Sequence, residues 1–216
     1  MRVVEIFNSI EGEGRRAGLP CTFVRLYGCN LNCSYCDSRY AWEESNAYKV
    51  MSIEEIIQQI ELYGCKNVTV TGGEPLIHSG IDKLLDTLVR KRYWVNVETN
   101  GTIEPVIHDY GRIFYTMDFK TNASGMSEKM NIDAFKCLND LDVLKFVVGS
   151  EEDLEQALEF TEKIPFREEP CIFVSPVFGK IEPVQIVEFI KKHKLWNWKV
   201  QVQLHKIIWS PDMKGV

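Results

Sequence analysis

Residues 29–36 read Cys-Asn-Leu-Asn-Cys-Ser-Tyr-Cys, so that Cys29, Cys33 and Cys36 lie close together in the chain. Iron–sulfur clusters are held by cysteine thiolates, usually by four of them. Three cysteines ligate three irons of a cluster and leave the fourth iron open to a molecule that is not protein. We therefore expect the chemistry of this chain to take place at that open iron.

The whole chain has the composition of an ordinary globular protein. Its 216 residues, of which 45% are hydrophobic and 26% charged, fit one domain over residues 1–216. The net charge of -6 argues against a nucleic-acid partner, because nucleic-acid-binding proteins usually carry a basic stripe. The N-terminus shows no signal-peptide pattern and no apolar run is long enough for a membrane span. We therefore expect a cytoplasmic protein with no membrane partner.

Seven cysteines in a cytoplasmic chain indicate metal or redox chemistry rather than disulfides. The four cysteines outside the cluster, Cys21, Cys65, Cys137 and Cys171, are scattered, and we expect them to be small buried hydrophobic residues. A structural zinc site is the alternative for the other three, but zinc takes four ligands, commonly from two pairs. The nearest extra ligands, Cys65 and His78, fall in other predicted elements, so an iron–sulfur cluster is favoured.

Strand-like runs alternate with helical patterns along the chain. The strand-like runs fall at residues 21–27, 67–71, 94–98, 113–118, 143–148, 171–175 and 199–204. Helical spacing follows a capping box at 52–55 and recurs at 81–89, 154–158 and 184–190, with weaker patterns at 103–108 and 132–138. This alternation predicts parallel strands joined by right-handed crossovers. About six strand–helix units are fewer than the eight of a complete barrel. We therefore predict an α/β fold of mostly parallel strands, a partial (βα)6-like barrel.

Glycine and polar residues follow nearly every predicted strand at its C-terminal end. They form the segments 28–29, 72–75, 99–101, 118–120, 149–150 and 175–176. Parallel α/β folds place their active sites at this edge of the sheet. We expect these segments to surround one site that includes the cysteines.

The Gly-Gly-Glu-Pro segment at 72–75 indicates, on its own, only a tight turn. It follows a strand, however, and the cysteine run has the form C-x3-C-x-aromatic-C, with Tyr35 before the last cysteine. In both motifs the chain resembles the radical S-adenosylmethionine (SAM) enzymes. The resemblance implies a radical SAM barrel with a [4Fe-4S] cluster on the three cysteines and SAM on the fourth iron. It also implies that Gly73 and Glu74 hold the SAM amino group, since glycine lets backbone approach a ligand and a carboxylate suits an ammonium.

Short segments around these motifs narrow the resemblance. They are Ser-Ile-Glu-Gly-Glu-Gly at 9–14, Phe-Val-Arg-Leu at 23–26, Cys-Asp-Ser at 36–38, Phe-Lys at 119–120, Ser-Gly-Met at 124–126 and the C-terminal residues 204–216. Over essentially its full length the chain resembles the 7-carboxy-7-deazaguanine synthase family. The resemblance implies a lyase that converts 6-carboxy-5,6,7,8-tetrahydropterin to 7-carboxy-7-deazaguanine with loss of ammonia, a step toward queuosine and other 7-deazapurines.

The same resemblance implies the mechanism and the partners. In the family the reduced cluster cleaves SAM to a 5'-deoxyadenosyl radical, which abstracts hydrogen from C6 of the substrate, and SAM is re-formed afterwards. Magnesium accelerates the rearrangement. Members are homodimers, and their reductant is flavodoxin or ferredoxin.

The resemblance also implies roles for individual residues. Arg25 matches an arginine that grips the substrate carboxylate, for which a guanidinium fork is well shaped. The other implied substrate contacts are Ile10, Glu11, Gly12, Glu13, Thr71, His205 and Val216, the last through its terminal carboxylate. The implied SAM contacts are Tyr35, Asp37, Gly73, Glu74, Asp118, Phe119, Lys120, Ser175, Pro176, Val177 and Phe178. Without the resemblance, Arg25 would be a surface arginine and His205 an ordinary structural histidine.

Two positions depart from the family pattern. Ser38 stands at the magnesium position, where threonine is usual; a serine hydroxyl still offers oxygen to a hard cation, but without the methyl group that fixes it. We expect the metal affinity or preference to shift. Glu11 stands where glutamine is usual and adds a negative charge near an anionic substrate. Outside the family context, Glu11 and Glu13 would be solvated loop charges.

Two other functions compete with the synthase. A radical SAM activase that makes a glycyl radical on a partner protein would share the cluster and the glycine turn. It has no need of the segments at 9–14 and 36–38, and it needs a broad groove rather than a closed pocket. A simple iron–sulfur electron carrier is expected to supply a fourth cysteine, which the spacing here does not provide.

Overall fold

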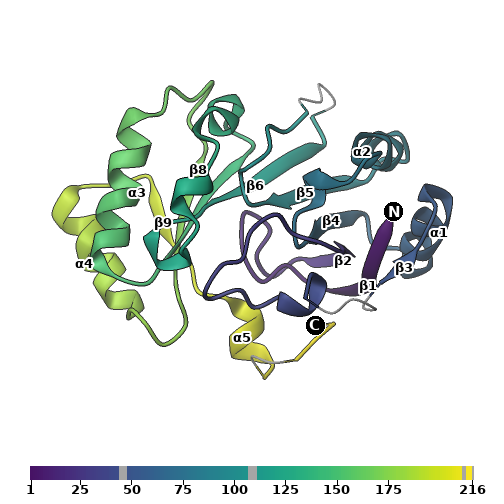
Figure 1. Cartoon of the computed structure of the whole chain (residues 1–216), viewed down its shortest axis with the longest axis horizontal. Coiled ribbons are helices and arrows are strands. Elements are labelled where there is room, and N and C mark those ends of the chain that lie inside the picture. The colour runs from purple at the N-terminus through teal and green to yellow at the C-terminus, as the bar shows by residue number, and fades with distance from the viewer. Residues whose placement is uncertain (44–47, 107–110, 211–212, 216) are drawn as a thin grey trace.

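The computed structural model describes residues 1–43, 48–106, 111–210 and 213–215, and within these ranges nine strands form one sheet in the order β3-β1-β2-β4-β5-β6-β7-β8-β9 (Figure 1). The strands are β1 (Arg2–Ile10), β2 (Pro20–Leu26), β3 (Lys49–Val50), β4 (Asn67–Gly72), β5 (Trp94–Thr99), β6 (Ile113–Phe119), β7 (Val143–Val148), β8 (Cys171–Pro176) and β9 (Trp198–Val200). Neighbours from β2 to β9 pair in parallel, whereas β1 and β3 pair antiparallel at one edge. The predicted α/β fold of mostly parallel strands is confirmed.

Four helices pack on one face of this sheet: α1 (Ile53–Tyr63), α2 (Ile81–Arg90), α3 (Glu151–Lys163) and α4 (Pro183–His193). Figure 1 shows α1 and α2 over the half with β1 to β5, and α3 and α4 over the half with β7 to β9. The first helix begins at the predicted capping box, in which the Ser52 hydroxyl accepts from the Glu55 N–H and the Glu55 carboxylate accepts from the Ser52 N–H. None of the helices in the described ranges is long and apolar enough to cross a membrane.

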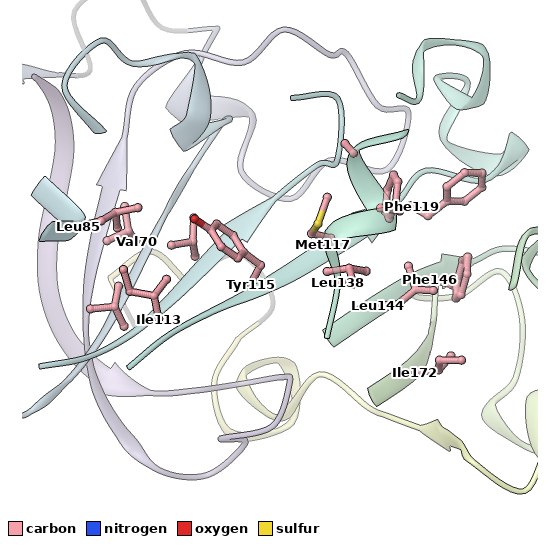
Figure 2. Packing of buried hydrophobic residues seen from close by; sticks show 14 of the residues in the cluster. Val70, Leu85, Ile113, Tyr115, Met117, Phe119, Leu138, Leu144, Phe146 and Ile172 are labelled. Atoms are coloured by element: carbon pink, nitrogen blue, oxygen red, sulfur yellow. The ribbon is translucent and has the colours of Figure 1, made fainter. Parts of the chain in front are cut away.

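The core lies between the helices and the sheet and is built from alternate strand residues. Figure 2 shows members of this layer, among them Val70, Met117, Leu144 and Phe146, all fully buried. Burying such a side chain contributes about 1.5–3 kcal/mol relative to leaving it exposed. Because strand side chains alternate between faces, the residues between these apolar positions point to the other face, away from α1, α2, α3 and α4. That face is available for a site.

Two regions differ from the sequence-based expectation. Strand β1 was not predicted, because it lies near the sheet edge and most of its residues are only half buried, so that no clear apolar alternation marks it. The last strand is β9, which is shorter than the predicted run at 199–204. There Gln201 turns its side-chain amide to the backbone of Gly14, and Leu204 donates to the Gly12 carbonyl at 3.0 Å and begins helix α5 (Leu204–Ile208).

The two weak helical patterns had different outcomes. Residues 132–138 form a 3₁₀ helix at Ile132–Cys137, shorter and tighter than an α-helix. Residues 103–106 are irregular, and the remainder of the pattern at 103–108 lies outside the described residues.

Candidate active site

A cavity of about 910 Å³ opens on the face opposite α1 to α4, at the C-terminal ends of the parallel strands. Its walls include the following residues singled out from the sequence: Glu13, Arg25, Cys29, Cys33, Tyr35, Cys36, Asp37, Ser38, Thr71, Gly73, Asp118, Lys120, Pro176, Val177 and Phe178. They come from loops and strand ends far apart in the chain. The expectation that the strand-end segments share one site therefore agrees with the structure.

The three cysteines lie on a loop that leaves β2 and crosses the mouth of the barrel. The loop is anchored by Gly28, whose N–H donates to the Ala41 carbonyl at 2.8 Å. All three cysteines line the cavity, and burial raises the pKa of the Cys33 thiol to about 11. The free Cys33 thiol is therefore protonated at neutral pH, and binding of a cluster would release its proton.

This donor set fits a [4Fe-4S] cluster. In residues 1–43, 48–106, 111–210 and 213–215, no three His, Cys, Asp or Glu side chains converge closely enough to hold one metal ion. A structural zinc ion needs such convergence, whereas a cluster takes each thiolate on a different iron and spreads its ligands over one wall. Three thiolates that line a common cavity would hold three irons of a cluster and would leave the fourth iron without one of these ligands.

The glycine turn packs directly against the cysteine loop. A Cβ atom on Gly73 would lie 2.2 Å from the Gly28 carbonyl oxygen and 2.8 Å from the Cys29 Cβ atom, so only glycine fits there. The next residue, Glu74, donates its N–H to the same Gly28 carbonyl at 2.8 Å. The turn therefore fixes where the cysteine loop starts.

The Glu74 carboxylate does not line the cavity. It is fully buried and accepts hydrogen bonds from the N–H of Leu76 (2.9 Å), the hydroxyl of Thr99 (2.8 Å) and the N–H of Asn100 (2.7 Å). It thus ties the glycine turn to the end of β5. Its implied contact with SAM stays a prediction.

A network of partly buried acidic and basic side chains forms the floor of the cavity. Lys120 donates to Asp118 Oδ2 at 2.9 Å, and Lys145 donates to Glu13 Oε2 at 2.8 Å and lies 3.9 Å from Asp118 Oδ2. Burial disfavours the charged lysine, but the carboxylates of Glu13 and Asp118 outweigh it and raise the pKa of Lys145. Burial works against the charge of Glu13 too, and Lys145 outweighs it, so the pKa of Glu13 is lowered. Both groups are charged at neutral pH.

One acceptor of this network is free. Asp118 Oδ1 is buried and makes no hydrogen bond to any residue in the described part of the chain. A buried carboxylate oxygen without a donor is unfavourable unless a ligand supplies one. Its place in the cavity wall suits a hydrogen-bond donor of a bound ligand.

On the far side of the cavity, β2, β4 and β5 each contribute one polar side chain. Arg25 lies opposite Thr71 in the β2–β4 register, and the Thr71 hydroxyl donates to Glu98 Oε2 at 2.8 Å. Burial, with the nearby charge of Glu11, raises the pKa of Glu98 to about 7. This carboxyl group therefore changes charge near neutral pH.

Several residues implied by the resemblance do not line the cavity: Ile10, Glu11, Gly12, Phe119, Ser175 and His205. The Phe119 ring faces the core, with its centroid 5.7 Å from that of Phe146, and Ser175 is fully buried. Gly12 and His205 meet, since a Cβ atom on Gly12 would lie 2.2 Å from His205 Nδ1. Val216 lies outside the described residues. Roles for these residues in ligand binding stay predictions.

Glu11 is neither a solvated loop charge nor part of the cavity wall. It is 1% exposed, and its Oε1 atom accepts from Arg16 Nη2 at 2.6 Å and from the Thr69 hydroxyl. Arg16 Nη2 also donates to the Val68 carbonyl, at 3.2 Å. Glu11 carries a negative charge that the usual glutamine would lack. The Arg16 guanidinium, at the N-terminal end of the strands, pairs with this charge.

Sequence reasoning missed several polar residues of the site, namely Glu5, Tyr40, Glu98 and Lys145. Two of them carried a readable signal. Glu98 and Lys145 each interrupt an apolar strand run at a position whose neighbours are buried against the helices. In a parallel strand buried on one side by helices, such a residue points to the opposite face.

The chain matches known proteins over its whole length. A family model of the Radical SAM superfamily matches residues 23–131. A 7-carboxy-7-deazaguanine synthase from Clostridium acetobutylicum is 44% identical, over 100% of this chain and 99% of the relative.

Solved structures agree with the sequence matches. The crystal structure of QueE from Escherichia coli has a TM-score of 0.77 at 26% identity, over 94% of this chain and 93% of that chain. Streptococcus suis SuiB bound to S-adenosylmethionine shares the fold, with a TM-score of 0.55 at 16% identity over 83% of this chain and 51% of that chain. This chain belongs to the 7-carboxy-7-deazaguanine synthase family of the radical SAM superfamily.

Proposed function

We propose that this chain converts 6-carboxy-5,6,7,8-tetrahydropterin to 7-carboxy-7-deazaguanine with loss of ammonia, in the biosynthesis of queuosine or another 7-deazapurine. The observation that carries the proposal is a single cavity with three cysteines on one wall and Arg25 on another. As a radical SAM enzyme the chain uses a [4Fe-4S] cluster and SAM. When bound, these cofactors supply the hydrogen abstraction at C6 of the substrate, and the protein binds, orients and shields the reactants.

Arg25 and Glu13 bind the two ends of the substrate in this proposal. The Arg25 guanidinium takes the substrate carboxylate, because its planar fork matches a carboxylate in shape and charge. Glu13 is kept ionised by Lys145, so it accepts hydrogen bonds from the 2-amino-pyrimidinone edge. Thr71, between them on β4, fixes the substrate above the sheet. Held at both ends, the pterin keeps one orientation toward the cofactor side.

The cofactor side of the cavity binds SAM with residues from several strand ends. Gly73 gives backbone access, and the free Oδ1 atom of Asp118 accepts from a SAM donor group. The remaining proposed contacts are Tyr35, Asp37, Lys120, Pro176, Val177 and Phe178. Tyr35 is held in place by its hydroxyl, which donates to the Val147 carbonyl at 3.3 Å. These walls exclude water from the reacting atoms.

Ser38 is the proposed magnesium ligand of the chain. Its hydroxyl donates to Asp37 Oδ1 at 3.0 Å, and both residues line the cavity. We expect Ser38→Ala to abolish the stimulation of turnover by magnesium while leaving SAM binding unchanged. Turnover measured against magnesium concentration checks this, with Ser34→Ala, another cavity serine, as the control. A Ser38→Ala enzyme with the magnesium response of the wild type would remove Ser38 as the ligand.

Substrate affinity is expected to fall as the pH rises through 7. Below pH 7 Glu98 is mostly neutral, and above it the group becomes an anion beside a cavity that holds an anionic substrate. We expect KM to rise about 3- to 10-fold between pH 6 and pH 8. Repulsion between the Glu98 anion and the anionic substrate would weaken substrate binding by about 1 kcal/mol. The measurement is the pH profile of KM for the wild type and for Glu98→Gln, whose profile should be flat. An identical slope in both enzymes would contradict the assignment.

The partners follow from the family. We infer a homodimer in the cytoplasm that receives electrons from flavodoxin or ferredoxin and binds neither nucleic acid nor membrane. Light scattering of the purified protein tests the dimer, and turnover supported by each reduced carrier tests the reductant.

Anaerobic turnover tests the proposed reaction directly. Reconstituted protein is incubated with SAM, a reductant, magnesium and 6-carboxy-5,6,7,8-tetrahydropterin, and the products are identified by mass spectrometry. We expect 7-carboxy-7-deazaguanine and ammonia. Deoxyadenosine without any 7-carboxy-7-deazaguanine would contradict the synthase and leave only the radical SAM chemistry.

A further inference from the structure

A β-bulge in β1 changes which residue faces Arg25. Val3 lies opposite Leu26, but Glu5 lies opposite Arg25, so one residue of β1 is extra at this point. Without the bulge, the pairing of Val3 with Leu26 would place Val4 opposite Arg25 and turn Glu5 to the helix side of the sheet. Bulges commonly re-aim a side chain beside an active site. Here the bulge brings a carboxylate to the face that carries the cavity.

Glu5 and Arg25 form a partly buried pair. Arg25 Nε donates to Glu5 Oε1 at 2.8 Å, and the two side chains are 15% and 22% exposed. The Tyr40 hydroxyl donates to the same oxygen, also at 2.8 Å. The Arg25 guanidinium carbon lies 5.9 Å from the Phe7 ring centre and 5.8 Å from the Tyr40 ring centre. The carboxylate and two aromatic rings thus fix the guanidinium.

The contact leaves one edge of the guanidinium available. A carboxylate binds arginine through two parallel N–H donors, either Nε with one Nη or the two Nη atoms. Glu5 occupies Nε, and within the described ranges the Nη atoms make no hydrogen bond. Arg25 itself lines the cavity. Its outer edge is the one that a ligand can reach.

We propose that Glu5 is a positioning residue, which occupies the Nε edge of Arg25 so that the outer Nη edge meets the substrate carboxylate, with Tyr40 holding Glu5 in place. The inference rests on the proposed function, since it takes Arg25 as the carboxylate-binding residue. The inference adds that the affinity of Arg25 for the carboxylate depends on strand β1 and its bulge, which lie outside the cysteine and glycine motifs.

Two ligands separate this role from a general effect on folding. The product 7-carboxy-7-deazaguanine carries the carboxylate, and 7-deazaguanine lacks it. Calorimetry measures Kd for both with wild type, Glu5→Ala, Glu5→Gln and Tyr40→Phe. We expect Glu5→Ala to raise Kd for the carboxylated ligand about 10- to 100-fold, the size of effect that loss of a charged hydrogen bond has. Kd for 7-deazaguanine should change less than about twofold. Glu5→Gln keeps a hydrogen-bond acceptor for Arg25 Nε, so this variant should lose less affinity for the carboxylated ligand than Glu5→Ala. Tyr40→Phe should raise Kd for the carboxylated ligand about 3- to 10-fold and leave Kd for 7-deazaguanine nearly unchanged.

Turnover gives a second readout. KM for the substrate is expected to rise in parallel with Kd for the product, and kcat is expected to stay within about threefold of the wild type. Glu61→Gln, which breaks an exposed pair with Lys91 at 2.8 Å, is the matched control and should change neither constant.

Arg25→Ala distinguishes the possible failures. If Arg25→Ala leaves Kd for the carboxylated ligand unchanged, the assigned role of Arg25 is wrong. If Arg25→Ala weakens binding but Glu5→Ala does not, Glu5 is not a positioning residue and the proposed function stands. Equal losses for both ligands in Glu5→Ala would make its role merely structural and overturn the inference. In an Arg25→Ala background, Glu5→Ala should add almost nothing, because coupled residues are not additive.

Discussion

Replacement of Cys33 by alanine is expected to remove the cluster and to lower turnover by at least about 10³-fold. Without the cluster the enzyme has no means of hydrogen abstraction, and the uncatalysed reaction is very slow. Cys33 is the most buried of the three cysteines, and no fourth cysteine among the described residues lines the cavity to replace it. Two thiolates hold a four-iron cluster poorly. Iron and sulfide content, visible absorbance and turnover measure the effect.

The chain offers matched controls for this substitution. Cys65 and Cys137 are half-buried and lie outside the cavity, so Cys65→Ala and Cys137→Ala should retain the cluster and nearly full turnover. Wild-type iron content in Cys33→Ala would contradict the assignment of the cysteine loop. Loss of iron in Cys65→Ala or Cys137→Ala would show that the cluster uses other ligands.

Replacement of Gly73 by alanine is expected to lower the free energy of unfolding by about 2–4 kcal/mol, as overpacking against fixed atoms does. The new Cβ atom would meet the Gly28 carbonyl at 2.2 Å, which is backbone and cannot swing away. Relief requires the cysteine loop to move, so cluster occupancy and SAM affinity should fall together. Urea unfolding, iron content and SAM binding are the measurements.

Gly64→Ala separates a steric effect from a backbone effect. Gly64 ends α1 with φ of 68°, and nothing lies within 4 Å of a Cβ atom built there. We expect this control to cost only about 1 kcal/mol, from the left-handed backbone alone, and to leave the cluster intact. Equal destabilisation by Gly73→Ala and Gly64→Ala, with iron retained in both, would contradict the packing of the turn on the cysteine loop.

The parallel part of the sheet could be predicted because its signal is local. Strands such as β7, with the sequence Val-Leu-Lys-Phe-Val-Val, are nearly continuous apolar runs, as strands covered by helices tend to be. Strand β1 gave no such signal, since most of its residues are half-buried and it pairs antiparallel with both β2 and the edge strand β3. The bulge in β1 depends on the pairing with β2, which no local pattern encodes.

The site could be located from the sequence, but the directions of its side chains could not. The glycine turn places Gly73 at the cavity, yet the adjacent Glu74 carboxylate is directed to Thr99 and Asn100, residues on the next strand loop. The resemblance placed Glu11 near the substrate, but in the structure its carboxylate is buried and paired with Arg16. This pairing depends on the tertiary fold of the loop and cannot be read from the sequence. Motifs identify the backbone that reaches a ligand; tertiary contacts decide which way each side chain points.

The form of the cavity bears on the rival activase. A volume of about 910 Å³ lies in the range of small-molecule sites. Its floor carries the acidic and basic residues Glu13, Asp118 and Lys145, each partly buried and hydrogen-bonded. Buried polar groups with fixed directions suit a small polar substrate, and a protein partner would require a broad open surface instead.

Transfer of deuterium from C6 of the substrate tests the central claim that SAM and the pterin share this cavity. The labelled substrate is turned over anaerobically, and SAM and product are recovered and examined by mass spectrometry. We expect deuterium in the recovered SAM, with 7-carboxy-7-deazaguanine formed in excess over any deoxyadenosine. Product formed with no label in SAM, or one deoxyadenosine released for every product, would contradict this expectation.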